Sequence, residues 1–285
     1  MKRNFWINFF WLLVYAFAGS LVTLLAVPLA SMLTTGAVTL HVVQWCQTLL
    51  MMLLPALLWV KLYKKERVRE VMHTAWPSWR VVALTVVLMV VSLPALDALA
   101  TACEGLPLPA WLDQWARDNA EAQQTVVDTM LSVEGVGGWL ELVMLMCVGT
   151  AVGEEAMFRG AVLRCFGGYN RHVAAVGVGL LFSLIHLEVY GFVPRWLLGA
   201  GFVYLVYWTR SIWPSVIAHA MNNLWALIEM KEAPEMLEHF GAVTTVASVV
   251  LMAATLWLIY REGEQHAAMS VAVGAEDGVS ADGER

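Results

Sequence analysis

Long apolar stretches recur along the chain and are separated by shorter polar or charged segments. A helix needs about 20 mostly apolar residues to cross a bilayer. The pattern therefore predicts an all-α, polytopic membrane helical bundle with about eight transmembrane helices. The predicted spans are Phe5–Leu33, Val38–Val60, Val81–Ala100, Gly138–Phe166, Val173–Tyr190, Arg195–Trp208, Ile212–Ile228 and Val243–Tyr260.

Two of the polar connections carry features of their own. The segment Lys61–Arg80 is basic and contains Trp76 and Trp79, which predicts an interfacial helix on the inner membrane surface, anchored by its indoles. The loop Thr101–Gly137 is long and acidic. Its apolar, acid-studded stretch Trp111–Leu131 predicts an external amphipathic helix that packs over the bundle, with substrate docking as the alternative role.

The spans and connections divide the chain into four regions. They are an N-terminal region (1–137), a core (138–228), a last span (229–260) and a polar cytoplasmic tail (261–285). The core holds four of the predicted spans and the N-terminal region holds three. The tail has too few apolar residues to pack, so we expect it to be disordered.

Composition and the placement of charge predict how the chain lies in a membrane. With 60% hydrophobic and only 14% charged residues, the chain is too apolar for a soluble domain. If the N-terminus is inside, thirteen of the 17 lysines and arginines lie in cytoplasmic segments, three lie outside and Arg159 lies in the membrane. The positive-inside rule then predicts N-in and C-in, which an even number of spans satisfies. We expect a multi-pass protein of the cell (plasma) membrane, with no nucleic acid partner.

The fourth predicted span carries a charged motif, two glutamates followed four residues later by an arginine. Charges at that depth cost about 2.5–3.5 kcal/mol each on insertion scales, so the motif is a functional-site hypothesis. Glu155 and Arg159 are four residues apart and can pair on one helix face. Glu154 lies about 100° round the helix, which leaves it free for general acid–base chemistry. Gly149 and Gly153 predict that a neighbouring helix approaches closely here.

Two later spans carry polar residues at a similar depth. Phe182 and His186 share one helix face, and His219 and Asn223 share another. At ~1.5 Å of rise per residue, these side chains and Glu154 converge near mid-membrane, which predicts one shared pocket. A carboxylate beside a histidine can activate water, and a histidine with an amide can stabilise an oxyanion. That combination suits amide hydrolysis.

Each of these residues also has a simpler interpretation. A histidine within a span often only bonds to a neighbouring helix, and the Glu155–Arg159 pair alone would be structural. Zinc is a competing use, because Glu154, His186 and His219 are the ligand types of a catalytic zinc site. The chain has no H-E-x-x-H motif to support the zincin pattern. Because Glu154 and His186 suffice to activate water, we expect no metal. An ion path in a transporter is a third use of intramembrane charge.

Together, the three motifs resemble those of the CPBP intramembrane endopeptidases. That family includes CAAX prenyl protease 2, the Abi proteins and the lysostaphin resistance protein A-like proteins. The resemblance covers about Gly138–Trp225 and implies an eight-helix membrane endopeptidase whose site lies in a cavity open to the cytoplasm. It implies that Glu154 carries out acid–base chemistry on water, with His186 beside it. It also implies an oxyanion site at His219 and Asn223. Glu155 and Arg159 would support the site, and Phe182 would line it.

The resemblance also sets expectations for partners and cofactors. The substrate should be a membrane-embedded or lipid-anchored protein or peptide, with the lipid bilayer as the surroundings. No cofactor is expected. The alternatives are a zinc-dependent version of the same protease and a non-proteolytic membrane immunity or scaffold protein of the same fold. The sequence indicates neither a prenylated substrate nor an oligomeric state.

Overall fold

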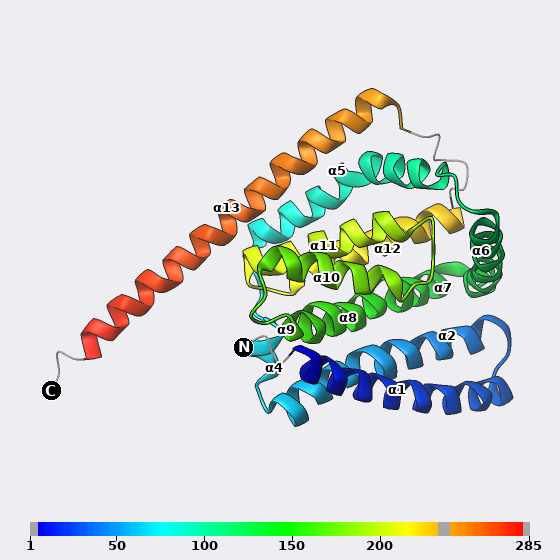
Figure 1. Ribbon diagram of the computed structural model, residues 1–285, viewed down its shortest axis with the longest axis horizontal. Helices are drawn as coiled ribbons and strands as arrows, with labels where there is room; N and C mark the ends of the chain where they lie inside the picture. The colour runs from blue at the N-terminus through cyan, green and yellow to red at the C-terminus, as the bar shows by residue number, and fades with distance from the viewer. Residues whose placement is uncertain (1–4, 233–239, 282–285) are drawn as a thin grey trace.

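The computed structural model describes residues 5–232 and 240–281, and all of their named elements are helices. Figure 1 shows most of these helices running along one common direction as a bundle. In chain order they are α1 (Phe5–Leu33), α2 (Gly36–Cys46), η2 (Gln47–Leu53), α3 (Leu54–Leu58), η3 (Trp59–Lys64), α4 (Val68–Val71), α5 (Trp79–Glu104), α6 (Ala110–Leu131), α7 (Gly135–Leu142), η4 (Val143–Gly149), α8 (Thr150–Glu155), η5 (Ala156–Val162), α9 (Leu163–Cys165), α10 (Arg171–Leu184), α11 (Phe192–Thr209), α12 (Trp213–Glu232) and α13 (Ala242–Ala281).

Helices cover most of the predicted spans, and elements α2 to η3 and elements α7 to α9 each form one continuous helix. The predicted span Val173–Tyr190 is too long, because α10 ends at Leu184 and His186 lies in the turn that follows. By length and composition, five helices in the described part of the chain can cross a membrane. The chain is therefore a membrane protein whose described residues form an all-helical fold, while eight spans and the N-in, C-in orientation stay predictions. The five are Phe5–Leu33, Gly36–Lys64, Trp79–Glu104, Gly135–Cys165 and Ala242–Gln265.

The prediction of one interfacial helix over residues 61–80 is wrong. The preceding helix ends at Lys64, and Lys65 takes a left-handed conformation with φ 55°. Only the four residues of α4 are helical before His73 turns the chain again, with φ 51°. Trp76 and Trp79 are nevertheless exposed, at 64% and 75%, as anchors would be. Two left-handed turns within nine residues break a helix that charge and aromatic content alone would favour.

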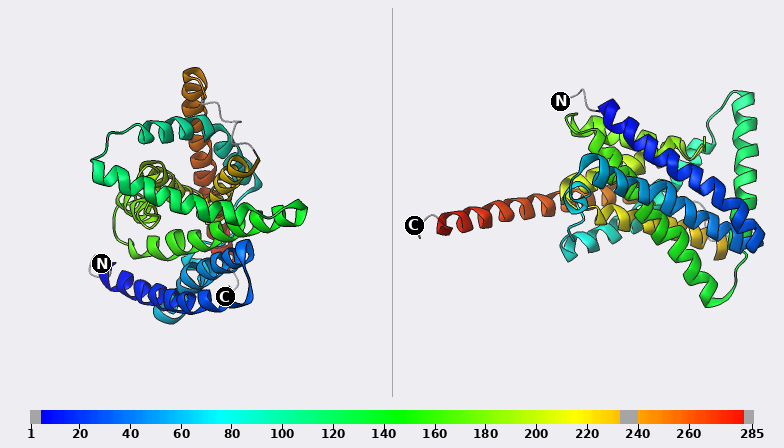
Figure 2. Two further views of the ribbon diagram at one scale, coloured as in Figure 1. Left: turned by 90° about the vertical axis from the view of Figure 1, so that its right-hand side faces the viewer. Right: turned by 90° about the horizontal axis from the view of Figure 1, so that it is seen from below.

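The predicted amphipathic helix is confirmed as α6, which lies across one end of the bundle (Figures 1 and 2). Asn119 donates to the carbonyl of Leu187 over 3.0 Å, and Asp113 accepts from the hydroxyl of Tyr190. Both bonds join α6 to the turn between α10 and α11. The side of the membrane on which α6 lies stays a prediction.

The C-terminal tail differs from its prediction. The sequence predicts disorder from Arg261, whereas α13 continues to Ala281. Extending a helix that the last span has already nucleated needs no new nucleation step. Figure 1 shows α13 leaving the bundle at the end opposite α6.

Helices α10 and α11 form a hairpin that packs through glycines. A methyl group at Gly179 would lie 2.7 Å from the backbone nitrogen of Ala200 and 2.7 Å from the carbonyl oxygen of Trp196. At Gly199 it would lie 3.0 Å from the Cα of Gly179. The two backbones therefore approach to a distance that a side chain would forbid. This contact fixes α10, which carries Phe182 and is followed directly by the turn that holds His186.

Two alanine substitutions in this hairpin should have opposite signs. Gly179→Ala forces α11 away and should destabilise the protein by about 1–3 kcal/mol, the usual cost of overpacking. Gly201→Ala places its methyl group in open space within α11 and should stabilise it by about 0.5–1 kcal/mol. Thermal unfolding of the purified variants in detergent measures both. Equal effects of the two changes would contradict the packing described.

Candidate active site

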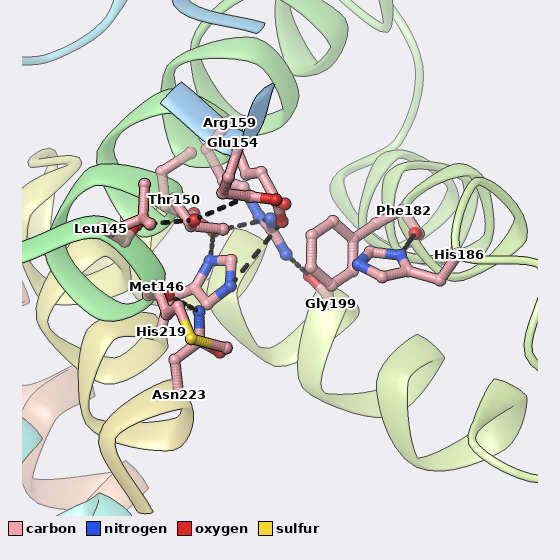
Figure 3. Close-up of polar contacts among 12 residues, drawn as sticks. Leu145, Met146, Thr150, Glu154, Arg159, Phe182, His186, Gly199, His219 and Asn223 are labelled. Carbon is pink, nitrogen blue, oxygen red and sulfur yellow. Dashed lines mark hydrogen bonds and ion pairs between the residues drawn. The ribbon is translucent and has the colours of Figure 1, made fainter. Parts of the chain in front are cut away.

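A buried ion pair lies at the centre of the bundle. Arg159 donates from Nη1 to Glu155 Oε1 over 2.8 Å, and neither side chain has any exposed surface. His219 Nδ1 lies 2.9 Å from the same oxygen. The predicted pairing of Glu155 with Arg159 is confirmed, and His219 of α12 joins it to form a three-residue network. Figure 3 shows Arg159 and His219 near Glu154.

The guanidinium of Arg159 has partners on several sides, although its Nε is buried without a hydrogen-bond partner. Its Nη2 donates to the carbonyl of Gly199 on α11 over 2.8 Å. The guanidinium carbon also lies 4.6 Å from the ring centre of Phe182 and 5.2 Å from that of Phe202. Bonds to charged or carbonyl oxygens and contact with aromatic faces offset the cost of burying a cation. Arg159 thus joins the helix that carries the charged motif, Gly135–Cys165 (the motif helix), to the α10–α11 hairpin.

Glu154 lies on the next face of the helix and is held differently. Its Oε2 is buried without a hydrogen-bond partner and lies 3.7 Å from His219 Nε2. Because Glu155 can only accept when ionised, His219 donates from Nδ1. The Nε2 of His219 therefore faces the carboxylate of Glu154, at a distance longer than a hydrogen bond. Glu154 is the carboxylate with the least direct support, as its place on the helix predicts.

His186 contributes a second imidazole on the other side of Phe182. It lies just beyond the end of α10, and its Nδ1 is 2.7 Å from the carbonyl oxygen of Phe182. That carbonyl can only accept, so Nδ1 donates and Nε2 is left as an acceptor in the neutral ring. The Phe182 ring centre lies 5.0 Å from that of His186 and 5.6 Å from that of His219. Phe182 therefore separates and orients the two histidines.

Asn223 lies one helical turn after His219. Its Nδ2 donates to the carbonyl of Met146 over 3.0 Å, which fixes the amide plane and commits one of its two amide hydrogens. The second hydrogen remains for a ligand.

On the motif helix, the hydroxyl of Thr150 accepts a hydrogen bond from the Gln44 amide over 3.3 Å. This bond adds to the close packing of the motif helix against the helix that contains Gln44.

The predicted close approach at Gly149 and Gly153 is confirmed. A methyl group at Gly149 would lie 2.8 Å from the Trp45 ring, and one at Gly153 would lie 2.8 Å from Thr48 Cγ2. Both neighbours belong to the helix Gly36–Lys64. That helix packs behind the motif and leaves the opposite side of Glu154 facing a cavity.

A cavity of about 470 Å³ joins the candidate residues. Its wall comes from α5, α8, α10, α11, α12 and the turn between α10 and α11. Glu154, Phe182, His186, His219 and Asn223 all line it, so the predicted shared pocket is confirmed. Glu155 and Arg159 are fully buried and do not line it.

The two parts of the cavity differ in character. Around the candidate residues its wall includes apolar side chains, among them Leu93, Leu198 and Phe202. Toward α6 it carries the carboxylates of Asp97, Glu104, Glu188 and Glu229 and the guanidinium of Arg195. Arg195 bonds to Glu188 across the start of the hairpin. A peptide segment in this cavity would pass an acidic entrance before it reached Glu154.

The sequence did not reveal three residues that contribute to the site, nor which histidine faces Glu154. Phe202 and Gly199 touch Arg159, yet an aromatic residue and a glycine in an apolar helix carry no signal of such a role. Asn222 lines the cavity, and as a polar residue in a predicted span it could have been singled out. The histidine nearest the Glu154 carboxylate is His219, whereas the family resemblance implies His186 beside it.

The three residues that the sequence offers as zinc ligands lie apart in this arrangement. Among the described residues, no group of three His, Cys, Asp or Glu side chains is placed to hold a metal ion. His219 uses Nδ1 on Glu155, and His186 is separated from it by the ring of Phe182. The zinc set inferred from the sequence thus shares one cavity without converging on one point.

Comparisons with known proteins locate the same region. Residues 137–225 match the family model described as type II CAAX prenyl endopeptidase Rce1-like. The matched segment contains all three motifs and runs from the motif helix to α12. Searches of curated proteins and of solved structures found no significant match.

Proposed function

We propose that this chain is a glutamate-dependent intramembrane endopeptidase, because residues 137–225 match the family model described as type II CAAX prenyl endopeptidase Rce1-like. It hydrolyses a peptide bond of a membrane-embedded or lipid-anchored protein or peptide. The observation that carries the proposal is the Glu154 carboxylate, which faces a 470 Å³ cavity beside two imidazoles and an amide. A pre-formed cavity with a few convergent polar groups is where chemistry is expected.

In the proposed mechanism, Glu154 accepts a proton from a water molecule in the cavity. The resulting hydroxide attacks the carbonyl carbon of the scissile bond, and the bond to nitrogen breaks when the leaving amine receives that proton. His186 supports the base, since its Nε2 can accept a hydrogen bond from the same water. General acid–base chemistry of this kind contributes about 10²–10⁴-fold to the rate.

The negative charge that develops on the carbonyl oxygen needs donors. His219 and Asn223 are proposed to supply them, from Nε2–H and from the amide hydrogen that Met146 does not use. Donation from both nitrogens requires the cationic form of His219 in this step, and the Glu155 carboxylate, 2.9 Å from Nδ1, holds the ring in place. Glu155 and Arg159 position this imidazole and do not touch the substrate.

The orientation and the location are part of the proposal. The chain is proposed to cross the cell membrane eight times with both termini inside. The five long apolar helices support a multi-pass arrangement, and the charge distribution supports the orientation. In this proposal, α10, α11 and α12 supply the three additional crossings.

Cleavage of a model membrane-anchored peptide by the purified protein in liposomes tests the proposal. Glu154→Ala and His186→Ala should each abolish cleavage while the protein still inserts and purifies normally. Unchanged cleavage in both variants would rule out the assignment.

A non-proteolytic immunity or scaffold role is the second candidate function. The fully buried Glu155–Arg159 pair would serve that role equally well as a structural element. Full complementation of a knockout by Glu154→Ala would favour that role.

Removal of metal separates this mechanism from the zinc-dependent alternative. We expect the activity to survive dialysis against a strong chelator, because the proposed base and donors act without a metal. Metal content and cleavage rate are measured on the same purified sample before and after chelation. One tightly bound zinc per chain whose loss tracks with activity would support the zinc-dependent version.

A further inference from the structure

The cavity extends toward only one end of the bundle. From Glu154 it continues along the second half of α5 to Glu104, along α12 to Glu229, and past the turn that holds Tyr190. These are the ends of elements that lie nearest α6 in Figure 1. None of the residues lining this cavity comes from α4, from α9 or from the last turns of α11.

The opposite end of the bundle is filled with apolar side chains. Beyond Glu155, all seven residues of η5 are buried, and Met157 and Phe158 belong to a core cluster with Val71 and Met72. A methyl group at Gly160 would lie 2.9 Å from the Met72 side chain. The connection between η3 and α5 therefore packs directly beneath the motif helix. A peptide could not reach Glu154 from that end without displacing the core.

Basic residues gather at the filled end of the bundle. They are Lys61, Lys64, Lys65, Arg67, Arg69, Arg80, Arg164, Arg171, Arg210 and Arg261, against Arg117, Arg195 and Lys231 near the end where α6 lies. The connection that contains α6 instead carries six acidic residues and one basic residue between 101 and 137. The positive-inside rule places the filled, basic end in the cytoplasm. Anionic lipid on the inner leaflet attracts the same basic segment.

These observations conflict with one expectation from the family resemblance. A bundle with its basic end in the cytoplasm cannot also open this cavity to the cytoplasm, because the cavity extends to the other end. We propose that the cavity opens on the extracytoplasmic side of the membrane, and that the substrate is a membrane-anchored protein or peptide whose cleaved segment lies on that side. The substrate half of this inference rests on the proposed function, whereas the position of the opening does not.

A cavity that opens on the extracytoplasmic side takes a different class of substrate. A lipidated C-terminus on the cytoplasmic surface would meet the closed end of the bundle. A segment that leaves the bilayer on the outer side would pass between α5 and the α10–α11 turn, past Glu104 and Glu188, and reach Glu154. Exported proteins and peptides that remain anchored by one span or by a lipid have such a segment.

Thiol labelling tests the position of the opening without any assay of activity. Single cysteines are introduced by Asn222→Cys inside the cavity, Glu104→Cys at its acidic end and Arg69→Cys at the basic end, after the four native cysteines are changed to alanine. A membrane-impermeant maleimide should label Glu104→Cys and Asn222→Cys on intact cells. It should label Arg69→Cys only in inverted vesicles. The reverse pattern at Glu104→Cys and Arg69→Cys overturns the inference, whatever the reactivity of Asn222→Cys.

Paired reporters test the substrate class. One single-span reporter carries its cleavable segment outside, and a second carries the same segment inside. Cleavage that is lost in Glu154→Ala should occur for the outside reporter and not for the inside reporter. Cleavage of the inside reporter alone contradicts the inference while it supports the peptidase. Loss of Glu154-dependent cleavage for both reporters contradicts the proposed function, and the labelling result still decides where the cavity opens.

Discussion

Glu154→Gln should lower the rate of peptide cleavage by about 10²–10⁴-fold, the contribution of a positioned general base. The amide has nearly the shape of the carboxylate and cannot accept the proton of water. The variant should fold as well as the wild type, because Oε2 of Glu154 is buried without a hydrogen-bond partner. Removing that charge removes a desolvation cost, so no loss of stability larger than about 1 kcal/mol is expected. Cleavage rate and thermal midpoint are measured on the same preparation.

A matched control removes one negative charge elsewhere. Glu121 is exposed on α6 and does not line the cavity, so Glu121→Gln should preserve both the rate and the midpoint. If Glu154→Gln unfolds the protein, the carboxylate is structural. If it folds and still cleaves at the wild-type rate, Glu154 is not the base.

Arg159→Met should destabilise the protein by about 3–5 kcal/mol, the cost of leaving one partner of a buried ion pair uncompensated. The change removes the bonds from Arg159 to Glu155 and to the Gly199 carbonyl. The variant should therefore unfold at lower temperature and accumulate less in the membrane. Thermal unfolding in detergent and the amount of inserted protein report this loss.

The double variant Glu155→Gln with Arg159→Met separates stability from activity. It should be less unstable than the sum of the single changes, because no unpaired charge remains. It should nevertheless stay inactive, since His219 loses the carboxylate that holds its Nδ1. Arg117→Met breaks an exposed pair of the same spacing with Asp113 and should leave the midpoint essentially unchanged. A double variant with wild-type activity would contradict the positioning role of Glu155.

Local patterns predicted the parts of the site that depend on one helix. The pairing of Glu155 with Arg159 follows from a spacing of four residues, and the close approach at Gly153 follows from the absence of a side chain. The all-helical fold and the amphipathic α6 also follow from the periodicity of apolar residues. In each case the information lies within one or two helical turns.

The relationships between helices could not be read in the same way. The order of residues gives depth in a bundle, so it predicts one pocket for Glu154, His186 and His219. It does not give the rotation of each helix about its axis. The sequence therefore could not reveal that the histidine facing Glu154 is His219. The contact of Arg159 with the Gly199 carbonyl is backbone chemistry and leaves no trace in residue type.

Two further predictions from the sequence differ from the structure for similar reasons. The connection at 61–80 has the composition of an interfacial helix, and left-handed turns at Lys65 and His73 break it. Charge predicted an orientation and the family resemblance predicted cytoplasmic access. Only the three-dimensional position of the cavity reveals that the two are incompatible.

The most direct test of the central claim compares the termini of membrane proteins in cells with the wild-type chain and in cells with Glu154→Ala. A glutamate-dependent intramembrane endopeptidase should generate new termini in or beside the membrane anchors of particular proteins, and those termini should disappear in the variant. Identical sets of termini in the two strains, with both forms of the protein present in the membrane at equal levels, would contradict the claim.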